Sequence, residues 1–452
     1  MKKSYLYILA GVAFIATSII LPYRLHWEDL HVYYVAGNSL LKGRTDLYAA
    51  NFADSQIMDY RYPVFFLITF LPFCFLPYVA VKVVWLWFNY AAMFLCIGAI
   101  RRGLDVIKIN SNRVYLAMIF SILVCTKYFI VSMQILNVHI VVLCMVFGAF
   151  YLALKGKDVF AAVLMALAIT FKIFPVLTLP YFVIKGRFRF VALTVAFVIV
   201  FNMLPAIYFG VETNNQLLKD WYNHVLVNNE FHNLNGPLNE SLQGQLERYL
   251  TFIEYEKRFD DPKYVRVNFA EMSSEQVGVI AKVLSGLLAL ATFLMIWFFA
   301  RLRNSRLSIE PQTQNSTRRF WETSFDDFAY HEFGFVICLM LLIEPRTNIY
   351  YYLALFFPLI AFFISYFRNR TTFNIIALLL IVTISCVLPL VPGKYIQRLF
   401  LVLGVDFYLT LILWIALGYN ILKSGKLTVE SEKWKHRNLK ASTVESQKVK
   451  VE

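Results

Sequence analysis

Long apolar runs recur along most of this chain of 452 residues. A helix needs about 20 predominantly apolar residues to cross the hydrocarbon core of a bilayer, and the runs at 62–100, 190–209, 277–300 and 372–391 all meet that length. Charged residues make up only 16% of the chain, whereas an ordinary soluble domain has about 25%. The sequence therefore predicts an all-α, polytopic integral membrane protein, with about eleven to thirteen membrane segments at this helix length.

The formal net charge of +14 is concentrated in short clusters between the apolar runs and in the C-terminal tail. Short loops rich in Lys and Arg mark the cytoplasmic side of membrane proteins. We therefore interpret the charge as a topology signal and not as a nucleic-acid-binding surface, and we predict that both termini are cytoplasmic. The clusters lie at 2–3, 101–113, 185–189, 301–319, 368–370 and 423–450.

The six cysteines all fall in apolar runs, without the spacing of metal ligands or of a disulfide framework. They are interpreted as small packing residues. No metal and no cofactor is predicted.

The boundaries of most membrane segments follow from the apolar runs. The first run, 5–21, is expected to remain as a signal anchor, because no small-residue cleavage site precedes Pro22. The run 62–100 is too long for one span and contains Pro72 and Pro77, so it predicts either two spans or a short re-entrant piece followed by one span. The remaining spans are expected at 114–131, up to 154, 159–184, 190–209, 277–300, 331–344, 348–366, 372–391 and 396–422.

These segments predict four parts along the chain. No internal repeat is visible, which argues against a transporter built from inverted repeats. The parts are a membrane module at 1–300 with outside loops at 23–62 and 210–276, a cytoplasmic linker at 301–330, membrane helices at 331–422, and a basic, disordered tail at 423–452.

The first outside loop begins with two adjacent carboxylates, Glu28 and Asp29. The apolar residues that follow are spaced by three and four, which predicts an amphipathic helix lying on the membrane surface. Acidic residues favour the N-terminus of a helix, so capping explains this pair as well as chemistry on a lipid headgroup does. The loop alone leaves both interpretations open.

Lys172 lies inside the apolar run 159–184, three residues before Pro175. Its ammonium group has three possible arrangements: it reaches the interface along its own stem, pairs with an acid on another helix, or binds an anionic ligand such as a lipid phosphate. Similar polar breaks near span ends contain Gln134 with Asn137, Asn239 with Ser241 and Arg248, and Glu344 with Arg346.

Five stretches, in chain order, carry a recognisable pattern. They resemble segments of the integral-membrane GT-C glycosyltransferases, and most closely glycosyltransferase family 87, which contains polyprenol-phosphate-mannose-dependent α-mannosyltransferases. The stretches are EDLHVYYVAGNSLLKGRTDLY (28–48), RYPVFFLITFLPFCFLP (61–77), MQILNVHIVVLCMVFGAF (133–150), ALAITFKIFPVLTLPYFVIKGRFR (166–189) and NESLQGQLER (239–248).

The resemblance implies roles for the polar residues of these stretches. Asp29 matches the carboxylate that acts as the catalytic base in the first outside loop of GT-C enzymes. Lys172, Arg248 and Arg346 are then candidates for holding the donor phosphate. The candidate substrate-binding residues are Glu28, Tyr33, Tyr34, Gln134, Asn137, Asn239 and Ser241.

The chain departs from the family pattern at three places. Met133 replaces a glycine, and Glu240 replaces the glutamine of N-Q-S-L. The stretch LLIEPRTNIYYYLALFFP stands where the family tends to have S-P followed by His or Trp, and it contains no histidine. The role of such a histidine is therefore not carried over.

The expected function is inverting transfer of a sugar, a mannose-like hexose, from a polyprenyl-phosphate donor to a lipid-linked or glycan acceptor on the extracytoplasmic face of the cell membrane. The expected partners are this donor, this acceptor and membrane lipids. Two alternatives remain from the residues. A transporter or flippase of lipid-linked saccharides would use mid-membrane charges such as Lys172. A polymerase or ligase of surface polysaccharide would use outside-loop residues such as His224 and His232.

Overall fold

The computed structural model describes most of the membrane part of the chain, and every regular element in its described ranges is a helix. Seven of these helices are long and apolar enough to cross a membrane, and five shorter apolar helices accompany them. The predicted all-α, polytopic membrane architecture is confirmed. Glu28, His232, the run 5–21, most of the linker 301–330 and the tail beyond Lys423 lie outside the described residues, which are 29–49, 60–107, 109, 111–227, 236, 238–253, 266–307, 325 and 328–423.

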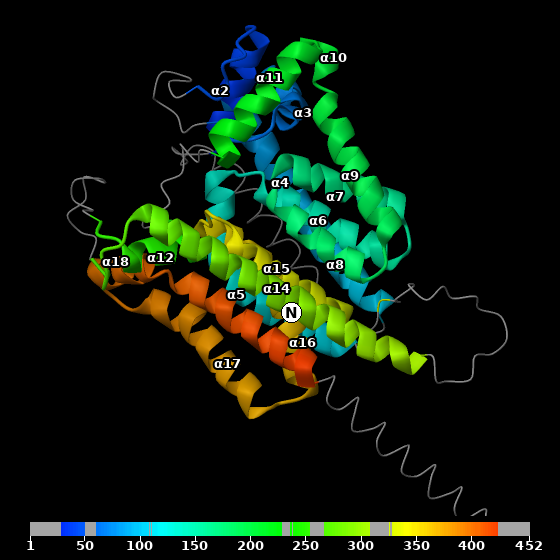
Figure 1. Cartoon of the computed structure of the whole chain (residues 1–452), viewed down its shortest axis with the longest axis vertical. Helices are drawn as coiled ribbons and strands as arrows, with labels where there is room; N and C mark the ends of the chain where they lie inside the picture. Colours follow the sequence, from blue (N-terminus) through cyan, green and yellow to red (C-terminus); the bar gives the residue numbers. More distant parts are fainter. Residues whose placement is uncertain are drawn as a thin grey trace, which may run out of the picture.

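The long membrane helices make up most of the body of the molecule (Figure 1). They are α4 (Tyr78–Val106), α5 (Ser111–Ile135), α9 (Phe188–Met203), α14 (Ser274–Leu307), η3 (Ile349–Leu355) with α16 (Phe356–Arg368), α17 (Thr372–Val382) with η4 (Thr383–Val387) and η5 (Leu388–Leu390), and a last helix at Val405–Lys423.

Shorter elements fill the spaces between the long helices and cover one end of the molecule. The apolar ones are α3 (Val64–Cys74), α6 (His139–Leu154), α7 (Asp158–Phe171), η1 (Phe174–Thr178) with α8 (Leu179–Ile184), and α15 (Ala329–Ile343). The others are α2 (Asp29–Leu41), α10 (Ala206–Phe209), α11 (Val211–Trp221), η2 (Tyr222–Val227), α12 (Leu242–Leu250) and α18 (Lys394–Leu403).

The ambiguous run 62–100 forms one short helix and one full span. The eleven residues of α3 extend about 16 Å at 1.5 Å per residue, so α3 cannot cross a hydrocarbon core of about 30 Å. Pro77 then occupies the N-cap of α4, which continues for 29 residues. A proline suits that position because its missing N–H group would have no helical partner there. Of the two alternatives, a short piece followed by one span is confirmed.

The prediction of a single span at 159–184 is wrong, because the chain turns back at Lys172. The backbone of Lys172 is extended, with φ −144° and ψ 127°, and Pro175 begins the next element. Arg187, just after α8, lies 3.5 Å from Asp158 at the start of α7. The two halves of this apolar run therefore return to the same end of the molecule, and Lys172 is at the tip between them.

The predicted span at 396–422 is also divided, at Gly404. This glycine ends α18 in a left-handed conformation with φ +64°, and a Cβ atom built there would lie 1.5 Å from the Gln245 side chain. Only glycine allows both this turn and the close approach of α12. Figure 1 shows α12 and α18 next to each other at one side of the molecule.

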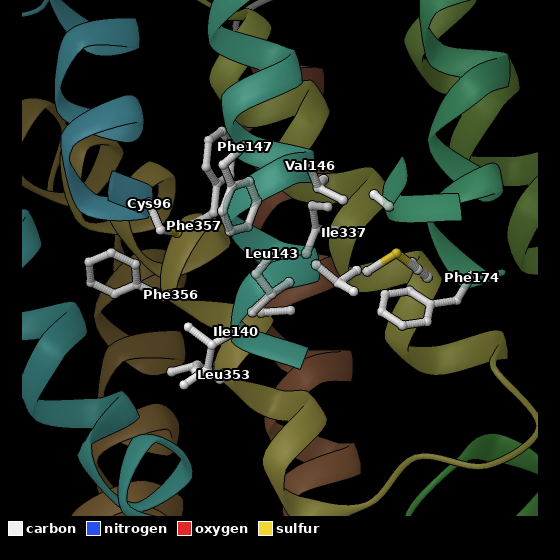
Figure 2. Packing of buried hydrophobic residues seen from close by; sticks show 14 of the residues in the cluster. Cys96, Ile140, Leu143, Val146, Phe147, Phe174, Ile337, Leu353, Phe356 and Phe357 are labelled. Atoms are coloured by element: carbon white, nitrogen blue, oxygen red, sulfur yellow. The ribbon is translucent and has the colours of Figure 1, made fainter. Parts of the chain in front are cut away.

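The interior is filled largely by aromatic and branched aliphatic side chains around α6 (Figure 2). Phe147 of α6 stacks on Phe357 of α16 with ring centroids 4.9 Å apart. Because lipid is as apolar as these side chains, close packing drives this association more than exclusion of water does. The labelled side chains of Figure 2 that pack here include Cys96, Ile140, Leu143, Val146, Ile337, Leu353 and Phe356.

The molecule has two distinct ends. At one end, which we call the basic end, Lys185 forms a buried ion pair with Glu332, and Tyr330 donates a hydrogen bond to the carbonyl of Ile100. Arg101, Arg187 and Arg368 belong to the same set of loops and helix termini. At the other end α2, α3, α10 and α11 gather (Figure 1).

Candidate active site

A cavity of about 660 Å³ lies beneath α2 and α11, at the end opposite the basic end. Three segments that are distant in sequence form its polar wall: the start of α2 with residues 61–63, the turn at Lys172, and the loop that joins α15 to η3. The charged residues that line it are Asp29, Arg61, Lys172, Glu344 and Arg346.

Asp29 is the first residue of α2, and its carboxylate is held from a different part of the chain. The side-chain amide of Asn137 donates a hydrogen bond to Asp29 Oδ2 and another to the Tyr62 hydroxyl, at 3.1 Å. Tyr62 in turn accepts a hydrogen bond of 2.8 Å from Tyr33. The side-chain amide of Asn137 thus orients the Asp29 carboxylate. A residue that served only as a helix cap would not need such a contact.

Asn137 owes its position to a sharp turn between α5 and α6. Leu136 adopts φ +52°, which is unusual for a residue other than glycine. Its carbonyl accepts a hydrogen bond of 2.9 Å from the Trp85 indole, and the Asn137 side-chain oxygen accepts one of 2.8 Å from the amide of His139. These contacts stabilise the strained turn and aim the remaining Asn137 amide hydrogens at Asp29 and Tyr62.

The environment of Asp29 makes its carboxylate a stronger base than an exposed aspartate. Burial raises the pKa of Asp29 above its ordinary value, while the hydrogen bond from Asn137 and the positive charges of Lys172, Arg61 and Arg346 act in the opposite direction. A carboxylate that binds protons more tightly accepts one more readily from an attacking hydroxyl group.

Lys172 presents a buried ammonium group to this cavity. Its Nζ lies 4.3 Å from the ring centroid of Tyr351 and 5.3 Å from that of Tyr350, and it has no hydrogen-bond partner among the described residues. The charges that act on it are those of Glu344 and Asp29. Of the three arrangements considered from the sequence, a cation held ready for an anionic ligand agrees best with this geometry.

Glu344 and Arg346 extend the polar wall from the loop after α15. Burial raises the pKa of Glu344 to about 8, and the positive charge of Lys172 opposes this rise. Arg61 lines the same cavity, and its carbonyl accepts a hydrogen bond of 3.1 Å from the Trp221 indole of α11. Three cationic and two acidic side chains therefore line one cavity.

The stretch around Asn239 supports the Glu344 loop from behind. Asn239 and Ser241 donate hydrogen bonds of 3.1 Å and 2.8 Å to the carbonyl of Pro345. The amide of Thr347 donates to the Asn239 side-chain oxygen at 3.1 Å. The residues on either side of Arg346 are thereby fixed to the segment before α12.

Arg248 is fully buried and stabilises the same segment. Its guanidinium group donates to the carbonyls of Val402, Gly236 and Asn239, at 2.7, 2.9 and 2.6 Å. The predicted contact of Arg248 with a donor phosphate is therefore replaced by contacts with backbone carbonyls, and Arg248 does not line the cavity.

Comparison with known families adds an independent observation. The model of glycosyltransferase family 87 matches residues 60–310, which is more than half of the chain. The chain belongs to glycosyltransferase family 87. No curated protein and no solved structure matches it. Membership makes it a membrane glycosyltransferase, and the predicted resemblance to this family is confirmed. The matched residues include four of the five quoted stretches, and the stretch 28–48 with Asp29 lies before them.

The cavity of this family 87 protein contains only part of the predicted residue set. Asp29, Tyr33, Lys172 and Arg346 line it, and Asn137 contacts Asp29 from behind. Tyr34, Gln134, Asn239, Ser241 and Arg248 lie elsewhere: Tyr34 donates to the carbonyl of Leu76 at 3.0 Å, and Gln134 is exposed at the end of α5.

Several lining residues of the family 87 cavity were not predicted. Arg61 and Tyr62 stand in the quoted stretch RYP, and Glu344 stands beside the predicted Arg346. Arg61 lies two residues before Pro63 and Glu344 directly before Pro345, so a charged residue close to a proline at the boundary of an apolar run is the signal that these two positions share. Tyr350 and Tyr351 carry no comparable signal, because tyrosines are common at membrane interfaces.

Proposed function

We propose that this family 87 glycosyltransferase moves a hexose, mannose-like in kind, from a polyprenyl-phosphate donor to a lipid-linked or glycan acceptor on the extracytoplasmic face of the membrane. The observation that carries the proposal is the placement of Asp29, held by Asn137, in one cavity with Lys172, Arg61 and Arg346. A base and a cluster of cations are the two components that such a transfer requires.

Asp29 acts as the general base in this proposal. The acceptor hydroxyl attacks the anomeric carbon of the donor sugar and gives its proton to Asp29, while the bond from that carbon to the phosphate oxygen breaks. The electron pair of this bond leaves with the polyprenyl phosphate. A single displacement of this kind inverts the anomeric configuration and needs no glycosyl-enzyme intermediate.

The leaving phosphate gains negative charge during this step. Cations fixed in a site with little water stabilise developing charge strongly, because the surroundings screen it weakly. Lys172, Arg61 and Arg346 are placed to supply that stabilisation. A lysine without another hydrogen-bond partner is suited to this role, because the phosphate completes its coordination.

The apolar side of the cavity supports a lipid-linked donor. It is formed by the tip after Lys172, by η2 and by the residue before Asn239. Ile173 and Val176 are partly exposed on the outer surface as well as lining the cavity, with 44% and 39% of their surfaces accessible. An isoprenoid chain would lie along this side, which is lined by Ile173, Val176, Leu177, Val225, Leu226 and Leu238.

The charge distribution supports the extracytoplasmic side for this reaction. Lys185, Arg187 and Arg368 gather at the basic end, and clusters of this kind mark the cytoplasmic side. The cavity lies at the opposite end of the helices. This arrangement supports an extracytoplasmic active site.

The test is transfer of labelled sugar from polyprenyl-phosphate donors into lipid or glycan, by membranes with and without the protein. We expect incorporation that requires the protein and that yields the inverted anomer. If no donor supports transfer and vesicles containing the protein instead translocate saccharide lipids, the proposal is wrong and the flippase alternative holds. Elongation of lipid-linked polysaccharide without use of a monophosphate donor would favour the polymerase alternative.

A further inference from the structure

Glu344 has a buried carboxylate oxygen with no hydrogen-bond partner among the described residues. Buried polar atoms in native proteins are almost always paired, and an unpaired one is costly. Glu344 also lines the cavity, so a ligand in the cavity would supply the missing partner.

The neighbours of Glu344 narrow the class of ligand. The carboxyl groups of Glu344 and Asp29 both act electrostatically on Lys172, and Glu344 lines the same cavity as this lysine. A carboxyl group offers a phosphate no positive charge in either protonation state, so phosphate binding does not explain Glu344. If Lys172 binds the phosphate of the donor, the sugar attached to that phosphate lies next to Lys172. Glu344 can then contact the sugar.

The shape of the site agrees with a sugar ring. Tyr350 and Tyr351 lie beside Lys172 and line the cavity, which provides aromatic surface for the C–H groups of a sugar. Glu344 and Lys172 add an acceptor and a donor. One sugar hydroxyl can donate to the first and accept from the second.

The position of Glu344 is fixed by hydrogen bonds to its neighbours in sequence. The carbonyl of Pro345 accepts from Asn239 and Ser241, and the amide of Thr347 donates to Asn239. A recognition group needs such support, because a loosely held side chain gives little discrimination. This role explains why two predicted substrate-binding residues lie behind the cavity wall and not in it.

We propose that Glu344 is a specificity-determining residue that hydrogen-bonds with hydroxyl groups of the sugar to be transferred. The inference rests on the proposed function, because it takes the bound ligand to be a polyprenyl-phosphate sugar. Burial favours the protonated form of Glu344, and both forms of a carboxyl group can pair with hydroxyl groups.

The test compares Glu344→Gln with Glu344→Ala in the full-length protein in nanodiscs. Both variants lack the ionisable carboxyl group, and only the alanine removes the hydrogen-bonding group. The probes are undecaprenyl phosphate and its mannosyl, glucosyl, galactosyl and arabinosyl esters, with the dissociation constant as the readout. Because neither variant has a carboxyl group at position 344, any electrostatic effect of Glu344 on phosphate binding is absent from both, and the comparison reports the hydrogen bond alone.

We expect Glu344→Ala to bind the preferred glycosyl ester about three- to tenfold more weakly than Glu344→Gln, the effect of losing a neutral hydrogen bond. The two variants should bind undecaprenyl phosphate equally. Equal binding of the glycosyl ester by both variants would overturn the inference and leave the proposed function intact. Wild-type protein that binds none of the lipids would overturn both.

Discussion

The side-chain amide of Asn137, at the turn between α5 and α6, donates a hydrogen bond to the carboxylate of Asp29 at the start of α2. The two residues are 108 positions apart in the sequence. The same amide also donates to Tyr62, so one side chain sets the orientation of Asp29 relative to the aromatic wall of the cavity.

Asn137→Ala is expected to reduce kcat for sugar transfer because the freed carboxylate samples unproductive orientations. Misplacing a catalytic group by about 1 Å costs on the order of a hundredfold. Gln134→Ala is the matched control, since Gln134 is exposed on the same helix end and does not line the cavity. Transfer assays should show a large loss for Asn137→Ala and a change within twofold for Gln134→Ala. Equal losses would show that the contact with Asp29 does not matter.

The pH dependence of transfer should reflect the buried state of Asp29. The deprotonated carboxylate is the active form, and burial raises the pKa of Asp29 above its ordinary value of 3.8. As the pH falls, the carboxylate is therefore lost at a higher pH than in an exposed aspartate. We expect kcat/KM to fall on the acidic side with a midpoint above about pH 4.

The hydrogen bond from Asn137 lowers the pKa of Asp29. Removing this bond in Asn137→Ala should therefore move the acidic midpoint to higher pH. A profile of kcat/KM against pH for both proteins checks the two statements together. An unchanged midpoint in the variant would show that the titrating group is not Asp29.

Lys172 and Arg248 were both candidates for holding the donor phosphate, and we expect their alanine variants to fail in different ways. Lys172→Ala removes a cation of the cavity, so it should weaken donor binding about tenfold or more, as loss of a charge-assisted hydrogen bond does. Its thermal unfolding midpoint should fall less than that of Arg248→Ala, because Nζ contacts the rings of Tyr350 and Tyr351 but has no hydrogen-bond partner among the described residues.

Arg248→Ala should instead destabilise the protein. Three backbone carbonyls lose their donor, and one hydrogen bond to a charged group is worth about 1.5–3 kcal/mol. Thermal unfolding in detergent and donor binding, measured on both variants, separate the two roles. A stable Arg248→Ala protein with weakened donor binding would restore the role predicted from the sequence.

Glu240→Gln, which introduces the residue that the family pattern has at this position, should stabilise the protein at neutral and alkaline pH. Burial, followed by the negative charge of Asp406, raises the pKa of Glu240 above its ordinary value of 4.5. Folded Glu240 therefore keeps its proton at pH values where the unfolded chain has lost it, and stability falls as the pH rises above about 4.5. Glutamine can still accept the hydrogen bond from the amide of Asp406.

The measurement for Glu240 is the thermal unfolding midpoint of wild type and Glu240→Gln between about pH 5 and about pH 9. The difference between the two proteins should grow with pH in favour of the variant. A constant difference would show that Glu240 has the same proton affinity in the folded and unfolded states.

Hydropathy predicted correctly those apolar runs that form one continuous helix. The helix expected at 114–131 forms at Ser111–Ile135, and the one expected at 331–344 forms at Ala329–Ile343. The predictions were wrong at 159–184 and 396–422, because hydropathy records how apolar a run is and not where the chain reverses. Pro175 and Gly404 carried the missing information, since each interrupts a helix through its backbone chemistry.

The site was only partly predictable for a related reason. Asp29 and Lys172 stood out because ionisable groups near the ends of apolar runs are rare. Asp29 and Lys172 line one cavity with Glu344 only because segments more than 150 residues apart in sequence pack together. The type and position of a single residue do not predict such packing. Arg248 stood in a predicted outside loop and was assigned to the donor phosphate by the resemblance alone. The structure instead surrounds its guanidinium group with backbone carbonyls.

The most direct test of the account is sugar transfer by Asp29→Asn, with donor binding measured on the same preparation. Asparagine keeps the size of the side chain and removes the base, and Asp46→Asn is the control, because Asp46 is half-exposed in the same loop and pairs with Arg44. We predict a loss of transfer of about a hundredfold or more, with donor binding retained and with Asp46→Asn equal to wild type. Undiminished transfer by Asp29→Asn would contradict the assignment of Asp29 as the base and would return it to the role of a helix cap.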